Sequence, residues 1–185
     1  PVSAGCLAGR RIMPHRGGPE MPNRAIAVAA HPGGVRGKNS GQEGLRVFTW
    51  NFLADDLATR AMLQQLVAAL TGAGLAESDI SNTELILAEV LNNIAEHAYA
   101  DGIGPVEVTV ELHKDGLVCA IADHGRPMPA GMVPDPEFPE IAPPDHLPEG
   151  GFGWHIIRCL TSDLGYQRED GWNRLTLAIP WADDG

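Results

Sequence analysis

Eight prolines crowd residues 126–150, and this segment constrains the fold more than any other part of the chain. Proline lacks a backbone N–H and fixes its φ angle, so neither a regular helix nor a central strand persists at this density. We therefore expect a long loop here, with structured segments on both sides of it. Long loops inside compact domains commonly act as lids or binding loops. The segment is thus the first candidate for a functional region.

Alternation of apolar and polar residues predicts strands on both sides of the loop. The valines at 106, 108 and 110 alternate with polar residues, and a turn at Lys114-Asp115-Gly116 leads into a more buried strand. A second turn, Asp170-Gly171, joins the last two strands. The expected strands are 45–52, 106–110, 117–122, 163–169 and 172–180.

Helical periodicity predicts three helices. The first spans 54–71 and is stopped by Gly72 and Gly74. The second is capped by Ser78 or Ser81, with Glu84 as the capping-box partner of Ser81, and runs to about Ala100. The third opens at the glycine-rich turn 150–153 and ends near Leu160.

The predicted order of elements is β-α-α-β-β-loop-α-β-β. This order predicts an α+β fold, a two-layer sandwich in which a mixed or antiparallel sheet carries helices on one face. Residues 45–181 are expected to form this domain. Residues 1–44 hold nine glycines and five prolines without an apolar period, so we expect a flexible tail there.

Charge narrows the range of partners. The formal net charge of −11 is divided between a tail of +4 and a remainder of −15. A body this acidic repels a phosphate backbone, so nucleic-acid binding is not expected, and a protein partner with a basic face suits it better. No apolar run of 18 residues occurs and no signal-like segment opens the chain, so neither a membrane span nor secretion is expected.

The three cysteines form no close pair, which argues against a disulfide framework and against a zinc site. Cys119 lies in an apolar strand pattern and Cys159 in an apolar helix pattern. We expect both to be small buried side chains in a reducing compartment.

The predicted helix at 84–100 has two chemically different faces. Its apolar face consists of Leu87, Leu91, Ile94 and Ala98, and its polar face of Glu89, Asn93, Glu96 and His97. Glu89 and Asn93 are four residues apart, so their side chains converge. A carboxylate beside an amide oxygen suits Mg²⁺ or a hydroxyl that is to lose its proton. A polar face turned to water is the simpler alternative.

Two further motifs are weak alone and stronger together. Asp123 ends a buried strand and Gly125 follows it, which places an acceptor for an exocyclic amine beside a residue free to adopt positive φ. An ordinary turn is the alternative. The glycines at 150–153 open a helix, where backbone N–H groups bind anions, although a plain loop-to-helix junction has the same pattern.

Along the chain, the acid-amide helix is followed by the Asp123-x-Gly125 strand end, the long loop and the glycine-rich helix start. Motifs in this order resemble those of the Bergerat-type ATPase and kinase superfamily, which includes histidine kinases and gyrase-like ATPases. The chain looks most like the small anti-sigma factor serine/threonine kinases, over about residues 45–181. The segment from Glu84 to Tyr99 is similar to the first ATP box of that family. The second box normally continues to a further glycine, where this chain has Arg126-Pro127, and Trp154 replaces a smaller aliphatic residue.

The resemblance implies a role for each matching residue. Glu89 is the expected general base, and Asn93 the expected Mg²⁺ ligand. The other implied ATP contacts are His97, Asp123, Gly125, Gly151, Phe152, Gly153 and Thr176, the last of these on the strand that passes the adenine pocket.

The implied protein is a cytoplasmic kinase that restrains a sigma factor and transfers the γ-phosphate of ATP to an anti-anti-sigma protein. Relatives of this kind are often dimers, so a homodimer is also implied. The alternative is a non-catalytic adaptor that uses ATP to switch protein partners.

Overall fold

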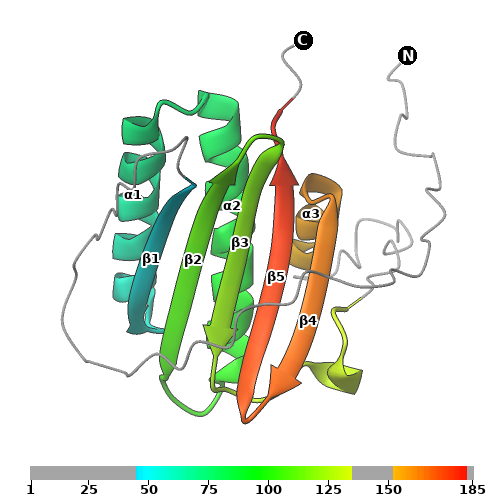
Figure 1. Ribbon diagram of the computed structural model, residues 1–185. Helices are drawn as coiled ribbons and strands as arrows, with labels where there is room; N and C mark the ends of the chain where they lie inside the picture. The colour runs from blue at the N-terminus through cyan, green and yellow to red at the C-terminus, as the bar shows by residue number, and fades with distance from the viewer. Residues whose placement is uncertain (1–44, 135–151, 183–185) are drawn as a thin grey trace, which may run out of the picture. The chain divides into compact units, whose positions relative to one another are not determined.

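The computed structural model describes residues 45–134 and 152–182, which form two layers (Figure 1). The tail expected at 1–44 and residues 135–150 of the expected loop lie outside the described residues. The strands are β1 Arg46–Leu53, β2 Pro105–His113, β3 Gly116–Asp123, β4 Asp163–Glu169 and β5 Trp172–Pro180, and the α-helices are α1 Asp56–Ala73, α2 Glu77–Asn93 and α3 Gly153–Leu160.

The five strands form one sheet in the order β1-β2-β3-β5-β4, and every neighbouring pair is antiparallel. The three α-helices lie on one face of this sheet (Figure 1). The expected α+β sandwich is therefore confirmed in its antiparallel form. In the hairpin between β4 and β5, Asp170 has φ 50° and Gly171 has φ 83°, as a tight turn that matches the strand twist requires.

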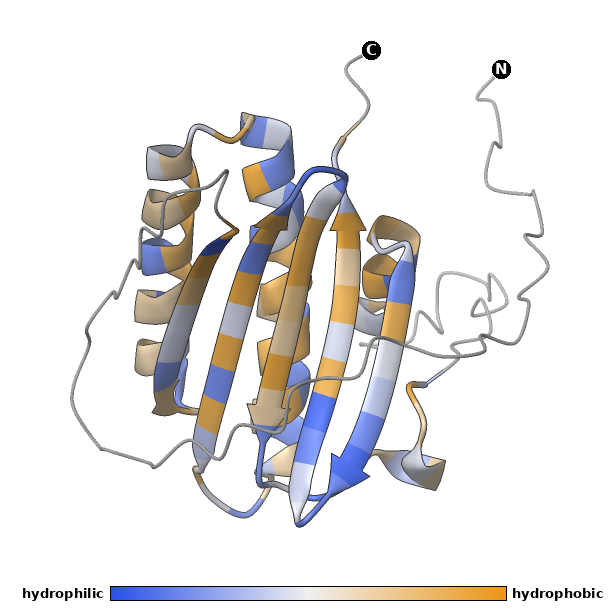
Figure 2. Cartoon of the chain, in the orientation of Figure 1, coloured by the Kyte–Doolittle hydropathy of each residue, from blue (hydrophilic) through white to orange (hydrophobic). Residues whose placement is uncertain are grey.

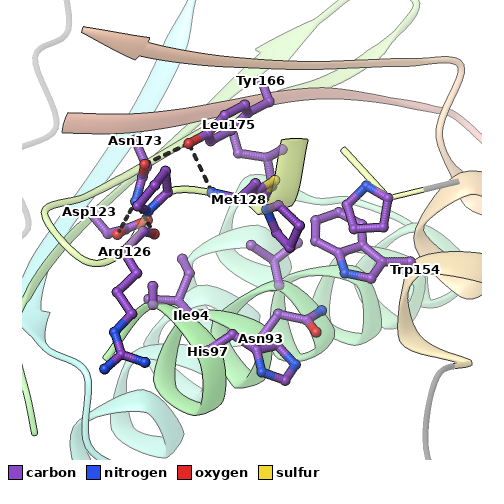
Figure 3. A pocket seen from close by; sticks show the side chains of 15 residues that line it. Asn93, Ile94, His97, Asp123, Arg126, Met128, Trp154, Tyr166, Asn173 and Leu175 are labelled. Atoms are coloured by element: carbon purple, nitrogen blue, oxygen red, sulfur yellow. Dashed lines mark hydrogen bonds between the residues drawn. The ribbon is translucent and has the colours of Figure 1, made fainter. Parts of the chain in front are cut away.

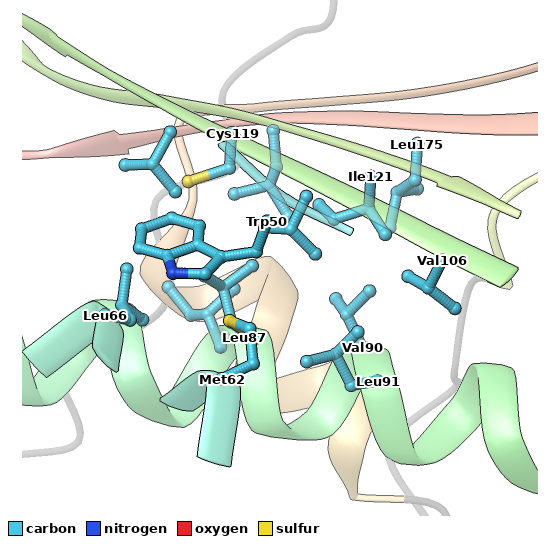
Figure 4. Close-up of a cluster of buried hydrophobic side chains, with 14 of the residues drawn as sticks. Trp50, Met62, Leu66, Leu87, Val90, Leu91, Val106, Cys119, Ile121 and Leu175 are labelled. Atoms are coloured by element: carbon cyan, nitrogen blue, oxygen red, sulfur yellow. The ribbon is translucent and has the colours of Figure 1, made fainter. Parts of the chain in front are cut away.

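Alternating burial along the strands builds the core. Along β2, the apolar bands in Figure 2 alternate with polar ones, and they include the buried valines at 106, 108 and 110. Val108, Val110 and Cys119 from the sheet are fully buried, and so are Ile86 and Leu87 from α2. Figure 4 shows Trp50 of β1 among these side chains, packed close to both α1 and α2. The site described below lies beside this core.

The helix boundaries differ from the predicted ones for identifiable reasons. α1 continues through Gly72 to Ala73 and is capped by Gly74, which adopts φ 85°. α2 begins at Glu77 after Ala76, without a side-chain cap, so the predicted cap at Ser78 or Ser81 with Glu84 is wrong. A tertiary contact holds this end of the helix instead, because the buried carboxylate of Asp79 accepts a hydrogen bond from the backbone N–H of Ala182.

The second helix also fails to continue as a single α-helix to Ala100. After Asn93 it changes to a π-helix over Ile94–Ala98, closed by a hydrogen bond from Tyr99 N to Ile94 O. One-turn π-helices inside longer helices are frequent at functional sites. This one alters the direction of the residues that follow Asn93, including His97.

α3 buries less than the other helices. Ile157 is its buried residue, whereas Cys159 is exposed, so the prediction of a buried thiol there is wrong. A helix of eight residues at the side of the sheet turns only a narrow face to the core. No helix within 45–134 or 152–182 is both long enough and apolar enough to cross a membrane.

Replacement of Leu87 by alanine should lower the free energy of unfolding by about 2–5 kcal/mol, because a fully buried side chain would leave a cavity between α2 and the sheet. Leu85 on the same helix is 43 % exposed, so Leu85→Ala is the matched control and should change stability by less than about 1 kcal/mol. Urea denaturation followed by circular dichroism measures both. Equal destabilisation by the two variants would contradict the placement of α2.

Candidate functional site

A cavity of about 490 Å³ lies between α2, with its π-helix, and the neighbouring ends of β3 and β5 (Figure 3). Its size falls in the range of small-molecule sites. Its walls also include the segment after β3, one residue of β4 and the first turn of α3. The lining residues are Val90, Asn93, Ile94, His97, Ala98, Asp123, Arg126, Pro127, Met128, Pro129, Pro134, Trp154, Tyr166, Asn173 and Leu175.

Asn93 is fixed in one orientation at the helical wall. Its side-chain nitrogen donates to the backbone carbonyl of Glu89 over 2.8 Å. Only the nitrogen of the amide donates to a carbonyl, so this contact also assigns the oxygen. Within the described residues, no hydrogen bond ends on Asn93 Oδ1. The wall thus presents an amide oxygen, a ligand type that Mg²⁺ accepts.

Glu89 lies one turn before Asn93 and reaches the start of α3. A Cβ atom at position 153 would lie 2.5 Å from Glu89 Oε2 and 3.7 Å from Asn93 Nδ2. Glycine at this position leaves room for the Glu89 carboxylate where it stands, and a larger residue would displace the end of that side chain. The carboxylate of Glu89, the amide of Asn93 and the N-terminus of α3 come together beside the cavity.

Asp123 lies at the other end of the cavity and is 5 % exposed. Its Oδ1 accepts from Gly125 N and from Asn173 Nδ2, each over 2.7 Å. Burial raises the pKa of Asp123, and the hydrogen bonds from Asn173 and Gly125 together with the charge of Arg168 oppose that rise. Within the described residues, Oδ2 accepts no hydrogen bond, which leaves it available to a ligand in the cavity.

Gly125 allows the end of β3 to meet the end of the π-helix. A Cβ atom there would lie 2.6 Å from the carbonyl oxygen of Ala98. The contact is completed by hydrogen bonds from Arg126 N to Ala98 O, 2.9 Å, and from His124 N to Tyr99 Oη, 2.8 Å. These bonds hold the two opposite walls of the cavity at a defined separation.

Arg126 carries a permanent positive charge to the cavity wall. Its guanidinium pairs with the carboxylate of Asp101, and the two side chains are 59 % and 79 % exposed. Exposed ion pairs contribute little, at most about 1 kcal/mol. Exchange of Asp101 for another anion therefore has a small energetic cost.

The structure brings Asn93, His97 and Asp123 to one cavity, with Gly125 beside it. It places Glu89 and Gly153 next to Asn93. Phe152 is 49 % exposed and precedes α3, and it does not line the cavity. Gly151 lies outside the described residues.

Thr176 does not join the other predicted contacts. It is exposed on the sheet face opposite the helices, where it pairs with Ala120 and Gly165. Asn173 and Leu175 of the same strand line the cavity instead. The alternation of β5 contained the signal, because Asn173 has the same strand parity as the buried residues Leu175 and Leu177, and a polar residue at such a position needs a partner.

A family model matches most of the described part of the chain. Residues 52–179 match the family described as the histidine kinase-like ATPase domain. The chain belongs to this family. Membership of an ATPase family implies that the domain binds ATP.

Curated relatives of the chain include the serine-protein kinase RsbW of Bacillus cereus strain AH187, which is 30 % identical over 100 residues. The RsbW of Bacillus mycoides strain KBAB4 is 29 % identical over the same length. Each match covers 53 % of this chain and 62 % of the relative, so the chain spans about three fifths of the relatives' length.

Among solved structures, the crystal structure of RsbU and RsbW domains from Mycobacterium tuberculosis has a TM-score of 0.50 and 20 % identity to this chain. It covers 72 % of this chain and 32 % of the other chain. At this identity, the likeness supports the fold alone.

Asp123→Asn should raise the thermal unfolding midpoint of the nucleotide-free protein at neutral pH. Asparagine keeps an oxygen that can accept the two hydrogen bonds. It also removes the charge of a carboxyl group whose pKa is raised by burial, which means that the ionised form is disfavoured in the folded protein. A raised carboxyl pKa means that the ionised form weakens the native state above that pKa. The difference between variant and wild type should therefore shrink as the pH falls through the raised pKa of Asp123.

Thermal scanning at stepwise lower pH measures this effect. Asp115→Asn is the control, because the Asp115 side chain is 81 % exposed and its removal should leave the midpoint nearly unchanged. A lower midpoint for Asp123→Asn at neutral pH would contradict the expected cost of the buried charge.

Proposed function

We propose that this domain is an anti-sigma factor with serine/threonine kinase activity, which binds ATP with Mg²⁺. The observation that carries the proposal is a cavity with two chemically different ends. A buried carboxylate, Asp123, lies at one end. Asn93, beside Glu89 and Gly153, lies at the other. The relatives named as serine-protein kinases support phosphoryl transfer as the chemistry.

Asp123 would bind the base. Its Oδ2 is an acceptor without a protein partner in the described residues, and the exocyclic amine of adenine is a matching donor. Ile94 and Leu175 line the cavity with apolar surface suited to the faces of an aromatic ring.

The opposite end fits a metal ion and phosphates. Asn93 Oδ1 would hold Mg²⁺, which when bound neutralises charge on the triphosphate. Gly153 and, by resemblance, Gly151 would bring backbone N–H groups to the phosphates. Arg126 would add a positive charge at the rim of the cavity, on the Asp123 side, and His97 lines the helical wall.

Glu89 would act on the incoming hydroxyl group. The hydroxyl oxygen of a serine or threonine forms a bond to the γ-phosphorus, and the bond from that phosphorus to the bridging oxygen breaks. ADP leaves with the electron pair, and the hydroxyl proton moves to the Glu89 carboxylate. Because Asn93 donates to the Glu89 backbone rather than to its carboxylate, the carboxylate is left to accept this proton.

The proposed partners are proteins. The acidic body of the domain favours a partner with a basic face, and we assign a sigma factor to that role. Phosphorylation of an anti-anti-sigma protein would inactivate it and leave the sigma factor held. We place this cycle in the cytoplasm, on residues 45–181, with the domain as a homodimer.

Wild-type protein should bind ATP in the presence of Mg²⁺, and Asn93→Ala should weaken that binding by at least about tenfold because a metal ligand is lost. Isothermal calorimetry measures both affinities. Asn92→Ala is the matched control, since Asn92 is exposed and does not line the cavity. Absence of binding heat and of any thermal shift with wild type at millimolar ATP would refute the proposal.

Glu89→Ala should slow phosphoryl transfer by about 10²- to 10⁴-fold and leave ATP affinity within a few fold, because the general base is lost while the contacts to base and metal remain. The measurement pairs nucleotide affinity with incorporation of labelled phosphate into an anti-anti-sigma protein. Glu96→Ala, an exposed position on the π-helix, is the control.

Two outcomes would change the assignment. Transfer by Glu89→Ala at the wild-type rate would remove Glu89 from the mechanism. Wild-type protein that binds ATP and phosphorylates no anti-anti-sigma protein would instead identify a non-catalytic adaptor that switches partners.

A further inference from the structure

The hydroxyl group of Tyr166 connects three segments around the cavity. It accepts a hydrogen bond from Met128 N over 3.1 Å and donates to Asn173 Oδ1 over 2.7 Å (Figure 3). Asn173 Nδ2 in turn donates to Asp123 Oδ1 over 2.7 Å. We call this chain of bonds, from Met128 through Tyr166 and Asn173 to Asp123, the Tyr166 relay. Every donor in it points toward the carboxylate, an arrangement in which each bond polarises the next.

Asn173 has no freedom to turn. It is 4 % exposed, and its oxygen accepts from both Tyr166 and the guanidinium of Arg168. A guanidinium only donates, so the amide orientation is fixed by chemistry. Its nitrogen faces Asp123 and the backbone carbonyl of Arg126, the latter at 3.0 Å.

This arrangement determines what Asp123 can recognise. Both of its hydrogen bonds end on Oδ1, so Oδ2 is the atom left to a ligand, and the carboxylate cannot rotate without breaking two bonds. An ionised carboxylate oxygen only accepts. It therefore attracts the amino group of adenine and repels O6, the acceptor that guanine carries at the same position of the ring.

We propose that Asn173 and Tyr166 are positioning residues that set the preference of this cavity for adenine over guanine nucleotides by holding Asp123 with one oxygen toward the base. The inference rests on the proposed binding of ATP and adds the source of base specificity. Neither residue needs to touch the nucleotide. Tyr166 acts through Asn173, and Asn173 acts through Asp123.

Tyr166→Phe tests the proposal, because it removes one oxygen atom and keeps the ring that lines the cavity. ATP affinity should fall by about 2- to 12-fold, the effect of one hydrogen bond, while GTP affinity stays nearly constant. The ratio of the two affinities should fall by the same factor. Calorimetric titration with each nucleotide in Mg²⁺ gives this ratio.

Tyr99→Phe is the matched control, since Tyr99 and Tyr166 are the two tyrosines of the chain and both contact the segment after β3. The Tyr99 hydroxyl accepts from His124 N and donates to Pro105 O, outside the Tyr166 relay. Its loss should change ATP and GTP affinity by equal factors. A purely structural role of Tyr166 would give the same result as this control.

Three results bear on three different roles. If Tyr166→Phe keeps the wild-type ratio of ATP to GTP affinity, the positioning role of Tyr166 is overturned while ATP binding stands. Wild-type protein with equal affinity for ATP and GTP overturns base recognition by Asp123 and the positioning role together. Wild-type protein that binds neither nucleotide refutes the proposed function.

If Tyr166→Phe fails to fold, Arg168→Gln is the deciding variant. The exposed Arg168 donates to the same oxygen of Asn173, so its loss should also lower the ratio of ATP to GTP affinity.

Discussion

The packing of α2 on the sheet determines the position of the polar groups on the helical wall of the cavity. Ile86, Leu87, Val90 and Leu91 fix one face of this helix against the strands. The helical period then places Glu89 and Asn93 at the side of that contact, where α3 begins. The Glu89 carboxylate and the Asn93 amide are therefore positioned by the apolar contacts of neighbouring residues on the same helix.

Local patterns were enough to predict much of this fold. Alternation and the turn at Asp170-Gly171 located β4 and β5 with the bounds that the structure shows, because a two-residue turn leaves little freedom in where the strands end. The start of α2 could not be predicted in this way. Its Asp79 is held by Ala182, 103 residues away in the sequence, and no local pattern encodes such a contact.

The same distinction applies to the candidate site. Asn93 and Asp123 belong to short motifs, and the structure places both on the cavity. The resemblance places the segment from Asn173 to Thr176 at the pocket and implies Thr176 as the contact, whereas Asn173 and Leu175 line the cavity. The difference depends on strand parity and on the register of β5 against β3. The π-helix that follows Asn93 has no comparable signature in the sequence. The expected roles of Gly151 and Phe152 stay predictions.

The hydrogen bond between Asp123 and Asn173 joins residues 50 positions apart in the sequence. The segment between Met128 and α3 lies inside the loop that this bond closes. The cost of closing such a loop grows slowly, by about 0.6 kcal/mol for each doubling of its length. A change in the length of that segment should therefore disturb the Asp123 end of the cavity very little. Under the proposed function, the residues that would select the base and those that would hold the phosphates lie on separate parts of the chain, so a change of length between them can alter one set and leave the other in place.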